Sequence, residues 1–266
     1  MNRTLTTPIA LSLERANARF GPLGARFGDA PDGWLRASDV VSSPEAVRDL
    51  LDQVQTLYGM DENERQIAAS FLVLGYFWYP MVGALACYLL DRRVPDLSTD
   101  AVATHVRDGV VFTSPRCFAL PDDPDADHPD VTVMADRDEL RACLIRKFDE
   151  HATPLFATLR SVAPYGFNGM RTNYVDRLAS AVLWLCEQIG DMDLARDEVP
   201  ACVALVNSKS RAGIIEIEHD GRSGVFLKRS GCCLSYRLPG NEMCDTCSLR
   251  SMDDRVEVLR KHLRYR

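Results

Sequence analysis

The chain has 266 residues, of which 46% are hydrophobic and 26% charged, enough to bury a large core in one large domain or two modest ones. Its formal net charge of −7 argues against a general nucleic-acid-binding protein. The sequence lacks the nucleophile-elbow, Walker, dinucleotide-binding and zinc-protease motifs, so it gives no indication of hydrolytic catalysis or of direct hydride transfer from a nicotinamide.

The first clear helix signal in chain order is Ser43-Pro44. Serine is a favoured N-cap residue and proline is favoured in the first helical turn. Apolar residues then recur at helical spacing, namely Val47, Leu50, Leu51, Val54 and Leu57. This pattern predicts an amphipathic helix from residue 44 onward.

Residues 67–90 form the most apolar stretch of the chain. The stretch is long enough to span a bilayer, but Gly75 and Pro80 interrupt it and charged residues flank it on both sides. No second segment of this kind follows. We therefore expect two buried helices that meet near Pro80, and at most peripheral contact with a membrane.

A Pro- and Asp-rich segment, residues 121–130, predicts an exposed, mobile loop. Its aspartates resemble the opening of a calcium loop, but the required glycine and distal glutamate do not follow. The strand-like runs 109–112 and 131–133 on either side predict a small sheet or hairpin. Further helices are expected from about residue 138 into the 150s, over about 172–188, and around 202–206.

The C-terminal region begins with two strand-like runs, 214–218 and 224–228, around the turn pair Asp220-Gly221. The second run leads directly into Gly231, Pro239-Gly240 marks another turn, and a closing helix is expected over 252–263. The predicted fold class is α+β, predominantly helical with a small β component. We expect a helical body over 1–210, with a β/loop insertion at about 105–135, and a C-terminal segment over 211–266.

Four of the nine cysteines fall within sixteen residues, in the pattern C-C-x10-C-x-x-C. They are Cys232, Cys233, Cys244 and Cys247. Such a group can form two disulfides, a structural zinc site or an iron–sulfur site. Disulfides require an oxidising compartment, whereas the N-terminal sequence is a poor signal peptide. The odd total also disfavours a disulfide framework, because five cysteines are scattered singly: Cys87, Cys117, Cys143, Cys186 and Cys202.

The spacing of the four cysteines favours iron–sulfur over zinc but leaves both open. Cys244-x-x-Cys247 has the form of a zinc knuckle. The adjacent pair Cys232-Cys233 does not, because neighbouring side chains of an extended chain point to opposite faces. A two-iron cluster is wider and tolerates this spread better, although thiolates suit both kinds of site.

The residues around the cysteines are basic. Residues 221–266 contain ten Lys or Arg and five Asp or Glu. A solvated helix face is one explanation. The other is that cations favour the reduced form of a cluster and attract an anionic partner. Lys228, Arg229 and Arg237 are nearest to the cysteines in sequence and are the first candidates for this role.

The cysteine motif, with Tyr236-Arg237-Leu238-Pro239-Gly240 inside it, resembles the C-terminal signature of the ferric siderophore reductases (FhuF-type proteins). The resemblance implies that all four cysteines bind a [2Fe–2S] cluster. It extends loosely upstream, to Ala68-Ala69-Ser70, to the segment that His151 opens, and to Asn173. His151, Asn173 and Tyr236 are therefore further candidates for substrate contact.

The implied activity is that of an oxidoreductase acting on metal ions. One electron from a ferredoxin-like donor would reduce siderophore-bound Fe(III), and Fe(II) would be released in the cytoplasm. The alternative is a non-enzymatic helical binding module with a structural four-cysteine zinc site; a redox-sensing regulator is a third hypothesis. For the cluster, we expect Cys244 and Cys247 on one iron and Cys232 and Cys233 on the other. The sequence leaves open the class of siderophore and the oligomeric state.

Overall fold

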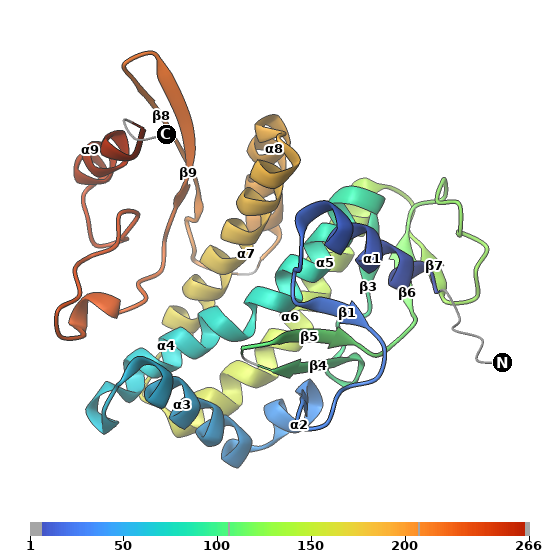
Figure 1. Cartoon of the computed structure of the whole chain (residues 1–266), viewed down its shortest axis with the longest axis horizontal. Helices are drawn as coiled ribbons and strands as arrows, with labels where there is room; N and C mark the ends of the chain where they lie inside the picture. The colour runs from blue at the N-terminus through green and yellow to red at the C-terminus, as the bar shows by residue number, and fades with distance from the viewer. Residues whose placement is uncertain (1–6, 106, 207, 264–266) are drawn as a thin grey trace. The chain divides into compact units, whose positions relative to one another are not determined.

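The computed structural model describes residues 7–105, 107–206 and 208–263. Its contacts divide the chain into two units: Met1–Arg48 with Gly75–Ser161, and Asp49–Leu74 with Val162–Arg266 (Figure 1). This division differs from the predicted boundary at residue 210, because the two helices that precede that boundary fall in the same unit as the C-terminal segment. Helices dominate and strands are few, so the predicted α+β class is confirmed.

The first unit combines helices with two small sheets. Its helices are α1 (Pro8–Phe20), α2 (Ala37–Ser42), α5 (Trp78–Asp91), η2 (Thr99–Ala101) and α6 (Arg137–Val162, which ends one residue beyond the unit). One sheet has the order β1 (Ala25–Phe27), β5 (Gly109–Phe112), β4 (Val102–His105), β2 (Leu35–Arg36). The other has the order β3 (Arg93–Pro95), β6 (Cys117–Ala119), β7 (Val131–Val133).

The two strands predicted on either side of the acidic loop both exist, but they do not pair with each other. β5 pairs with β1 in parallel and with β4 in antiparallel orientation, and all four of its residues are buried. β7 instead pairs in parallel with β6. A hairpin between these two strands is therefore wrong: they belong to two different small sheets, in which β5 pairs with its sequence neighbour β4 and with the distant β1, and β7 pairs with β6.

The apolar stretch forms two helices, as predicted. α4 (Arg65–Tyr76) ends one residue before Phe77, and α5 starts at Trp78. Pro80 lies in the first turn of α5, where its missing N–H costs no helical hydrogen bond. By length and composition alone the run Glu62–Asp91 could span a membrane, but 72% of its apolar window is buried inside the protein.

The acidic loop is anchored rather than wholly exposed, which corrects the prediction. Both oxygens of Asp123 accept hydrogen bonds from Arg93, at 2.6 and 2.7 Å, and both side chains are at most 3% exposed. The same guanidinium donates to Asp125 Oδ2 at 2.6 Å and to the carbonyl of Pro8 at 2.8 Å. A buried arginine needs such partners, and the loop supplies two of them.

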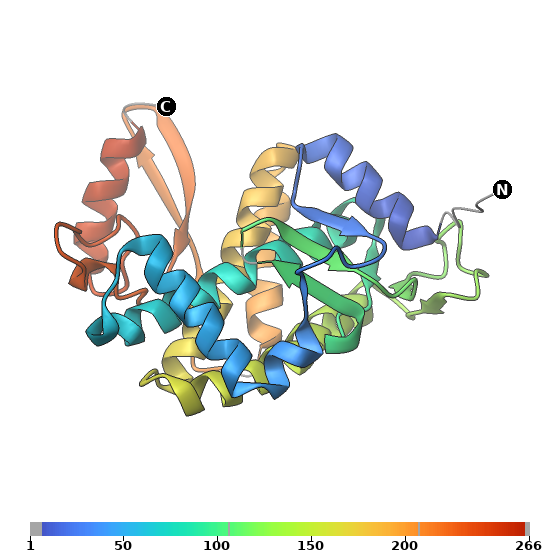
Figure 2. The same cartoon turned by 60° about the horizontal axis from the view of Figure 1, so that its bottom comes forward.

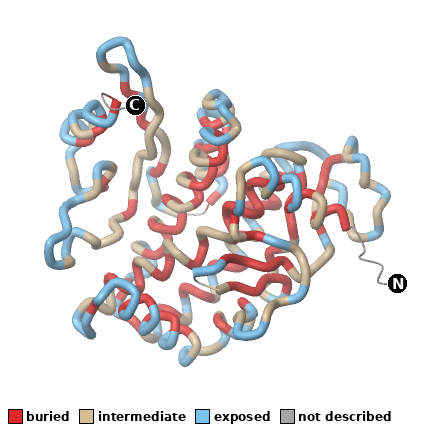
Figure 3. The backbone as a smooth tube through the Cα atoms, in the orientation of Figure 1, coloured by how far each residue is buried: buried red, intermediate tan, exposed pale blue. Residues whose placement is uncertain are grey.

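The second unit is built on α7, a helix with buried residues along most of its length (Figure 3). Its elements are the C-terminal part of α3 (Pro44–Tyr58), η1 (Glu62–Glu64), α4, α7 (Phe167–Ile189), α8 (Met192–Leu205), β8 (Gly213–His219), β9 (Arg222–Lys228), η3 (Ser235–Arg237) and α9 (Met252–Leu263). The predicted N-cap of α3 is confirmed, because Ser43 Oγ accepts from the Ala46 N–H at 3.1 Å. Leu57, expected on its apolar face, is 44% exposed.

The predicted hairpin is confirmed and is tighter than expected. Its strands reach His219 and Arg222, which leaves a two-residue turn with φ of 50° at Asp220 and 74° at Gly221. Positive φ at both residues is typical of a hairpin turn that matches the strand twist. α9 lies beside the hairpin (Figure 2), and the two share a small apolar core of Ile215, Ile217, Leu259 and Leu263.

Candidate metal centre

The four clustered cysteines lie on one segment that follows β9. Cys232 and Cys233 come four and five residues after the last residue of the strand. The chain then turns back at Leu238–Asn241, where the Asn241 N–H donates to the Leu238 carbonyl at 3.1 Å. Cys244 and Cys247 follow, closed by a turn in which the Cys247 N–H donates to the Cys244 carbonyl at 3.0 Å. All four are free thiols; Cys247 is buried and the others are half-buried.

One cysteine from each half of the segment interacts with the other. A hydrogen bond between the side chains of Cys233 and Cys244 lowers the pKa of Cys233 and raises that of Cys244. Burial raises the pKa of Cys232, and the hydrogen bond from the Leu234 N–H opposes that rise. Among the described residues, no group of three or more His, Cys, Asp or Glu side chains has the geometry to hold a single metal ion.

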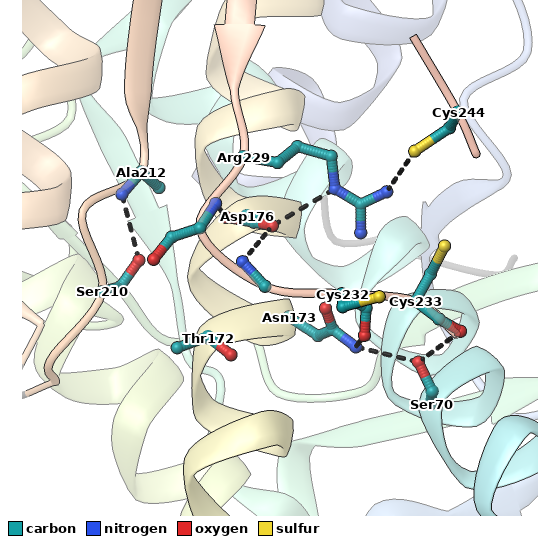
Figure 4. Close-up of polar contacts among 12 residues, drawn as sticks. Ser70, Thr172, Asn173, Asp176, Ser210, Ala212, Arg229, Cys232, Cys233 and Cys244 are labelled. Carbon is teal, nitrogen blue, oxygen red and sulfur yellow. Dashed lines mark hydrogen bonds and ion pairs between the residues drawn. The ribbon is translucent and has the colours of Figure 1, made fainter. Parts of the chain in front are cut away.

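Arg229 is the cation next to these sulfurs (Figure 4). Its Nη1 donates to Cys244 Sγ at 3.7 Å and its Nε donates to Asp176 Oδ2 at 3.2 Å. Its Nη2 is buried without a hydrogen-bond partner. Burial alone would lower the pKa of Arg229, but Asp176, Cys233 and Cys244 raise it overall, so the guanidinium is charged.

Asp176 on α7 fixes the start of the cysteine segment. Its carboxylate accepts from the Ser230 N–H at 2.8 Å and from the Gly231 N–H at 2.9 Å, in addition to Arg229. The side chain is 1% exposed. Burial raises the pKa of Asp176, while the Ser230 N–H and Arg229 oppose that rise. One carboxylate thus holds both the backbone and the cation of the site.

Asn173, one helical turn before Asp176, holds the two adjacent cysteines (Figure 4). Its Nδ2 lies 3.1 Å from the Cys232 carbonyl and 2.8 Å from Ser70 Oγ, which donates to the Cys233 carbonyl at 3.0 Å. Gly231 is packed so closely here that a Cβ would collide with Asn173 Oδ1 and lie 2.8 Å from the backbone nitrogen of Asn173. A glycine is therefore required where the segment crosses α7.

The other predicted site residues have different positions. Lys228 ends β9 and is half-buried, and Tyr236 lies on η3 with 40% exposure. Arg237 is at the edge of the segment, where its Nη1 donates to Gln66 Oε1 at 2.8 Å. α9, expected to cover the site, packs on the hairpin, and Arg255 donates from it to the Arg229 carbonyl at 3.1 Å.

His151 belongs to the first unit and is engaged there, which gives it a structural role. Its Nδ1 lies 3.0 Å from the Leu97 carbonyl and its Nε2 lies 2.9 Å from Tyr76 Oη. A carbonyl only accepts, so Nδ1 carries the proton and Nε2 accepts from the tyrosine. Burial lowers the pKa of His151 to about 4, so the ring is neutral.

Sequence reasoning missed Asp176, Gln66 and the role of Ser70. The available signal was a pair of polar residues, Asn173 and Asp176, three apart within an apolar helix. Residues at this spacing share a helix face, and a buried carboxylate requires partners. Nothing local in the sequence indicates that those partners are the backbone amides of residues 230 and 231.

The donor set suits an anionic iron–sulfur group. It offers four thiols, a charged guanidinium with one unpartnered buried N–H group, and the Leu234 N–H, which donates to Cys232 Sγ at 3.4 Å. Hydrogen bonds to sulfur and nearby positive charge stabilise such clusters and tune their potentials. Holding this group would need no ligand from outside the segment.

Comparison with known proteins agrees with this chemistry. Residues 229–249 match the family model of the FhuF 2Fe-2S C-terminal domain, and this range includes Arg229 and all four cysteines. No curated protein matches the chain. The match selects iron–sulfur over the zinc alternative that the spacing had left open. Over these residues the chain is similar to the 2Fe-2S domain of FhuF-type proteins, and its cofactor is a [2Fe–2S] cluster.

Proposed function

We propose that the protein is a ferric siderophore reductase in which Cys232, Cys233, Cys244 and Cys247 hold the cluster. The observation that supports this most is the close association of a four-thiol segment with one buried cation. Arg229 contacts Cys244 at 3.7 Å and retains an unpartnered N–H group. This arrangement suits a site whose negative charge increases by one during turnover.

The bound cluster supplies a one-electron redox centre. The protein's own residues set its surroundings. Arg229 stabilises added negative charge and Asp176 keeps the guanidinium in place. Asn173 and Ser70 hold the carbonyls of the adjacent cysteines. Three of the four cysteines are half-buried, which keeps the site near the surface, where an iron chelate can approach.

The overall reaction moves one electron from a ferredoxin-like donor to the Fe(III) of the chelate and gives Fe(II). Fe(II) is a poorer partner for hard anionic oxygen ligands and is released from the chelate. A one-electron protein donor is proposed because the sequence has no dinucleotide-binding fingerprint. Release in the cytoplasm is part of the same proposal.

Serine substitution of each of the four cysteines tests the ligand assignment. Each Cys→Ser variant is expected to lose or shift the visible absorption of the cluster and to lose most Fe(II) formation. Iron and sulfide content per chain and capture of Fe(II) by a colorimetric chelator are the measurements. Cys143→Ala, at a buried thiol of the first unit, is the control. Full iron release by any one of the four variants would refute the assignment of that ligand.

A further inference from the structure

A cavity of about 230 Å³ lies in the second unit beside the cysteine segment. Its wall includes Arg229, which also contacts Cys244, and Thr246, which lies between Cys244 and Cys247. Arg177 and Ser180 on α7 complete its polar wall. No cysteine is among the lining residues, so the cavity is a separate space next to the cluster ligands.

The charged lining carries an excess of positive charge. Two guanidiniums, Arg177 and Arg229, face the cavity with one carboxylate, Asp176. That carboxylate is already occupied, because it accepts from Arg229 and from the N–H groups of Ser230 and Gly231. Burial and then the neighbouring Arg229 lower the pKa of Arg177 to about 10. An anion in the cavity would relieve the repulsion between the two cations.

The chemistry of the wall selects a carboxylate among anions. Guanidiniums bind carboxylates through paired, charge-assisted hydrogen bonds, and the Ser180 and Thr246 hydroxyls can donate further ones. The side chains of Leu74 and Leu227 supply an apolar part of the wall. The volume lies below the roughly 300–1,000 Å³ of typical small-molecule sites, so the cavity suits one acid group on a short arm rather than a whole ferric chelate.

We propose that this cavity binds a carboxylate arm of the ferric chelate, so that the substrates are siderophores that carry free carboxylates. The inference rests on the proposed function and specifies its substrate class. Because Arg229 contacts both the cavity and Cys244, a carboxylate bound there would hold the chelated iron beside the cysteine segment. Arg177 would be a substrate-positioning residue, acting through the carboxylate and not as a ligand of the cluster.

The test uses cluster-loaded full-length protein and the variants Arg177→Gln, Arg177→Lys and Arg196→Gln. Arg196 is a half-exposed arginine of the same unit that pairs with Asp193 and Glu216 and does not line this cavity; its substitution controls for loss of one charge. Binding of the redox-inert Ga(III)–citrate complex is measured by calorimetry on the oxidised protein. Fe(II) formation is measured by mixing anaerobically reduced protein with Fe(III)–citrate or with an Fe(III)–trihydroxamate that lacks carboxylates.

Arg177→Gln is expected to weaken Ga(III)–citrate binding and to lower kcat/KM for Fe(III)–citrate by about tenfold or more, as for loss of a charged hydrogen bond. Arg177→Lys should retain most of the Ga(III)–citrate binding and most of the Fe(III)–citrate reduction. Arg196→Gln should match the unaltered protein in both. The rate of trihydroxamate reduction should be unchanged in Arg177→Gln. Equal losses on both chelates, or no loss in Arg177→Gln, would overturn the inference.

Three further outcomes separate this inference from the proposed function. Reduction of the trihydroxamate without any binding of Ga(III)–citrate would overturn the carboxylate site alone. If metal-free citrate changes the trihydroxamate rate in the unaltered protein but not in Arg177→Gln, the cavity is an effector site and the substrate assignment is wrong. Failure of the intact cluster-loaded protein to reduce any ferric chelate would instead refute the reductase function.

Discussion

At the scale of single residues, the buried pair Asp176–Arg229 is the feature that best explains the site. A buried ion pair is seldom a net gain in stability over apolar packing, so its presence calls for another reason. Asp176 accepts from two backbone amides of the cysteine segment, and Arg229 donates to a cysteine sulfur. The pair therefore places one positive charge beside the cysteines and keeps it there.

Arg229→Gln tests this role through the reduction potential of the cluster. A positive charge favours the reduced, more negative form, so its removal should make the potential more negative. Charged hydrogen bonds contribute about 1.5–3 kcal/mol, which corresponds to a shift of roughly 65–130 mV for one electron. The measurement is a redox titration followed by EPR. Arg229→Lys should shift the potential less, and an unchanged potential in Arg229→Gln would show that the charge does not act on the cluster.

His151 gives a second prediction at this scale, in the pH dependence of stability. Burial holds the folded pKa at about 4, below the unfolded value of about 6.5. The unfolded chain thus binds a proton that the folded chain does not, and stability falls as pH drops from 6.5 toward 4. Through this residue, acidification from about pH 7.5 to 5.5 should lower the free energy of unfolding by about 1 kcal/mol. Acidification to pH 4 should lower it by about 3 kcal/mol in total.

Chemical denaturation of the unaltered protein and of His151→Gln across this pH range measures the effect. The variant is expected to be less stable at neutral pH, because Tyr76 and the Leu97 carbonyl lose their buried partner. Its stability should nevertheless fall less steeply on acidification. Parallel curves for the two proteins would show that His151 is not buried as a neutral ring.

At the scale of elements, the site depends on how the cysteine segment lies on α7. The hairpin β8–β9 delivers the segment and α9 packs on the hairpin through a small apolar core. Gly231 then crosses α7 in direct contact with the backbone at Thr172 and Asn173. The amide of Asn173 and the hydroxyl of Ser70 bind the carbonyls that follow. The position of the first two cysteines is therefore set by helices distant in sequence.

Gly231→Ala is predicted to loosen this docking while leaving the helices folded. The added methyl group would meet main-chain atoms, which cannot rotate away as a side chain can, so the segment must shift. Iron per chain after reconstitution should fall about twofold or more, with little change in the far-UV circular dichroism. Gly213→Ala is the matched control, because a Cβ at Gly213 meets nothing within 4 Å. Equal iron content in both variants would contradict the docking account.

At the scale of the whole molecule, local features were predictable and long-range ones were not. The hairpin, the closing helix and the cysteine motif are each contiguous in sequence, and their bounds were predicted within a few residues. In the first unit the strands β5 and β7 were predicted at their observed residues, but the parallel pairing of β5 with β1 and of β7 with β6 was not, because no local pattern indicates it.

The same distinction explains the partial prediction of the site. Arg229 was predicted because it is close to the cysteines in sequence. Asp176 was missed because it lies more than fifty residues away and meets them only after α7 has packed. The burial of Asp123 in the first unit was missed for the same reason. An aspartate in a proline-rich segment is expected to be exposed, and its partner Arg93 is 30 residues away in sequence. The assignment of α7 and α8 to the second unit likewise depends on packing.

The central claim is that the four cysteines of the second unit bind a [2Fe–2S] cluster that reduces ferric chelates. The most direct measurement is EPR of protein purified without oxygen and reduced with dithionite, together with iron and sulfide assays and the absorption spectrum. The account predicts a coloured protein that bleaches on reduction, about two irons and two sulfides per chain, and an S = 1/2 signal. A colourless protein that contains one zinc and shows no EPR signal would contradict it.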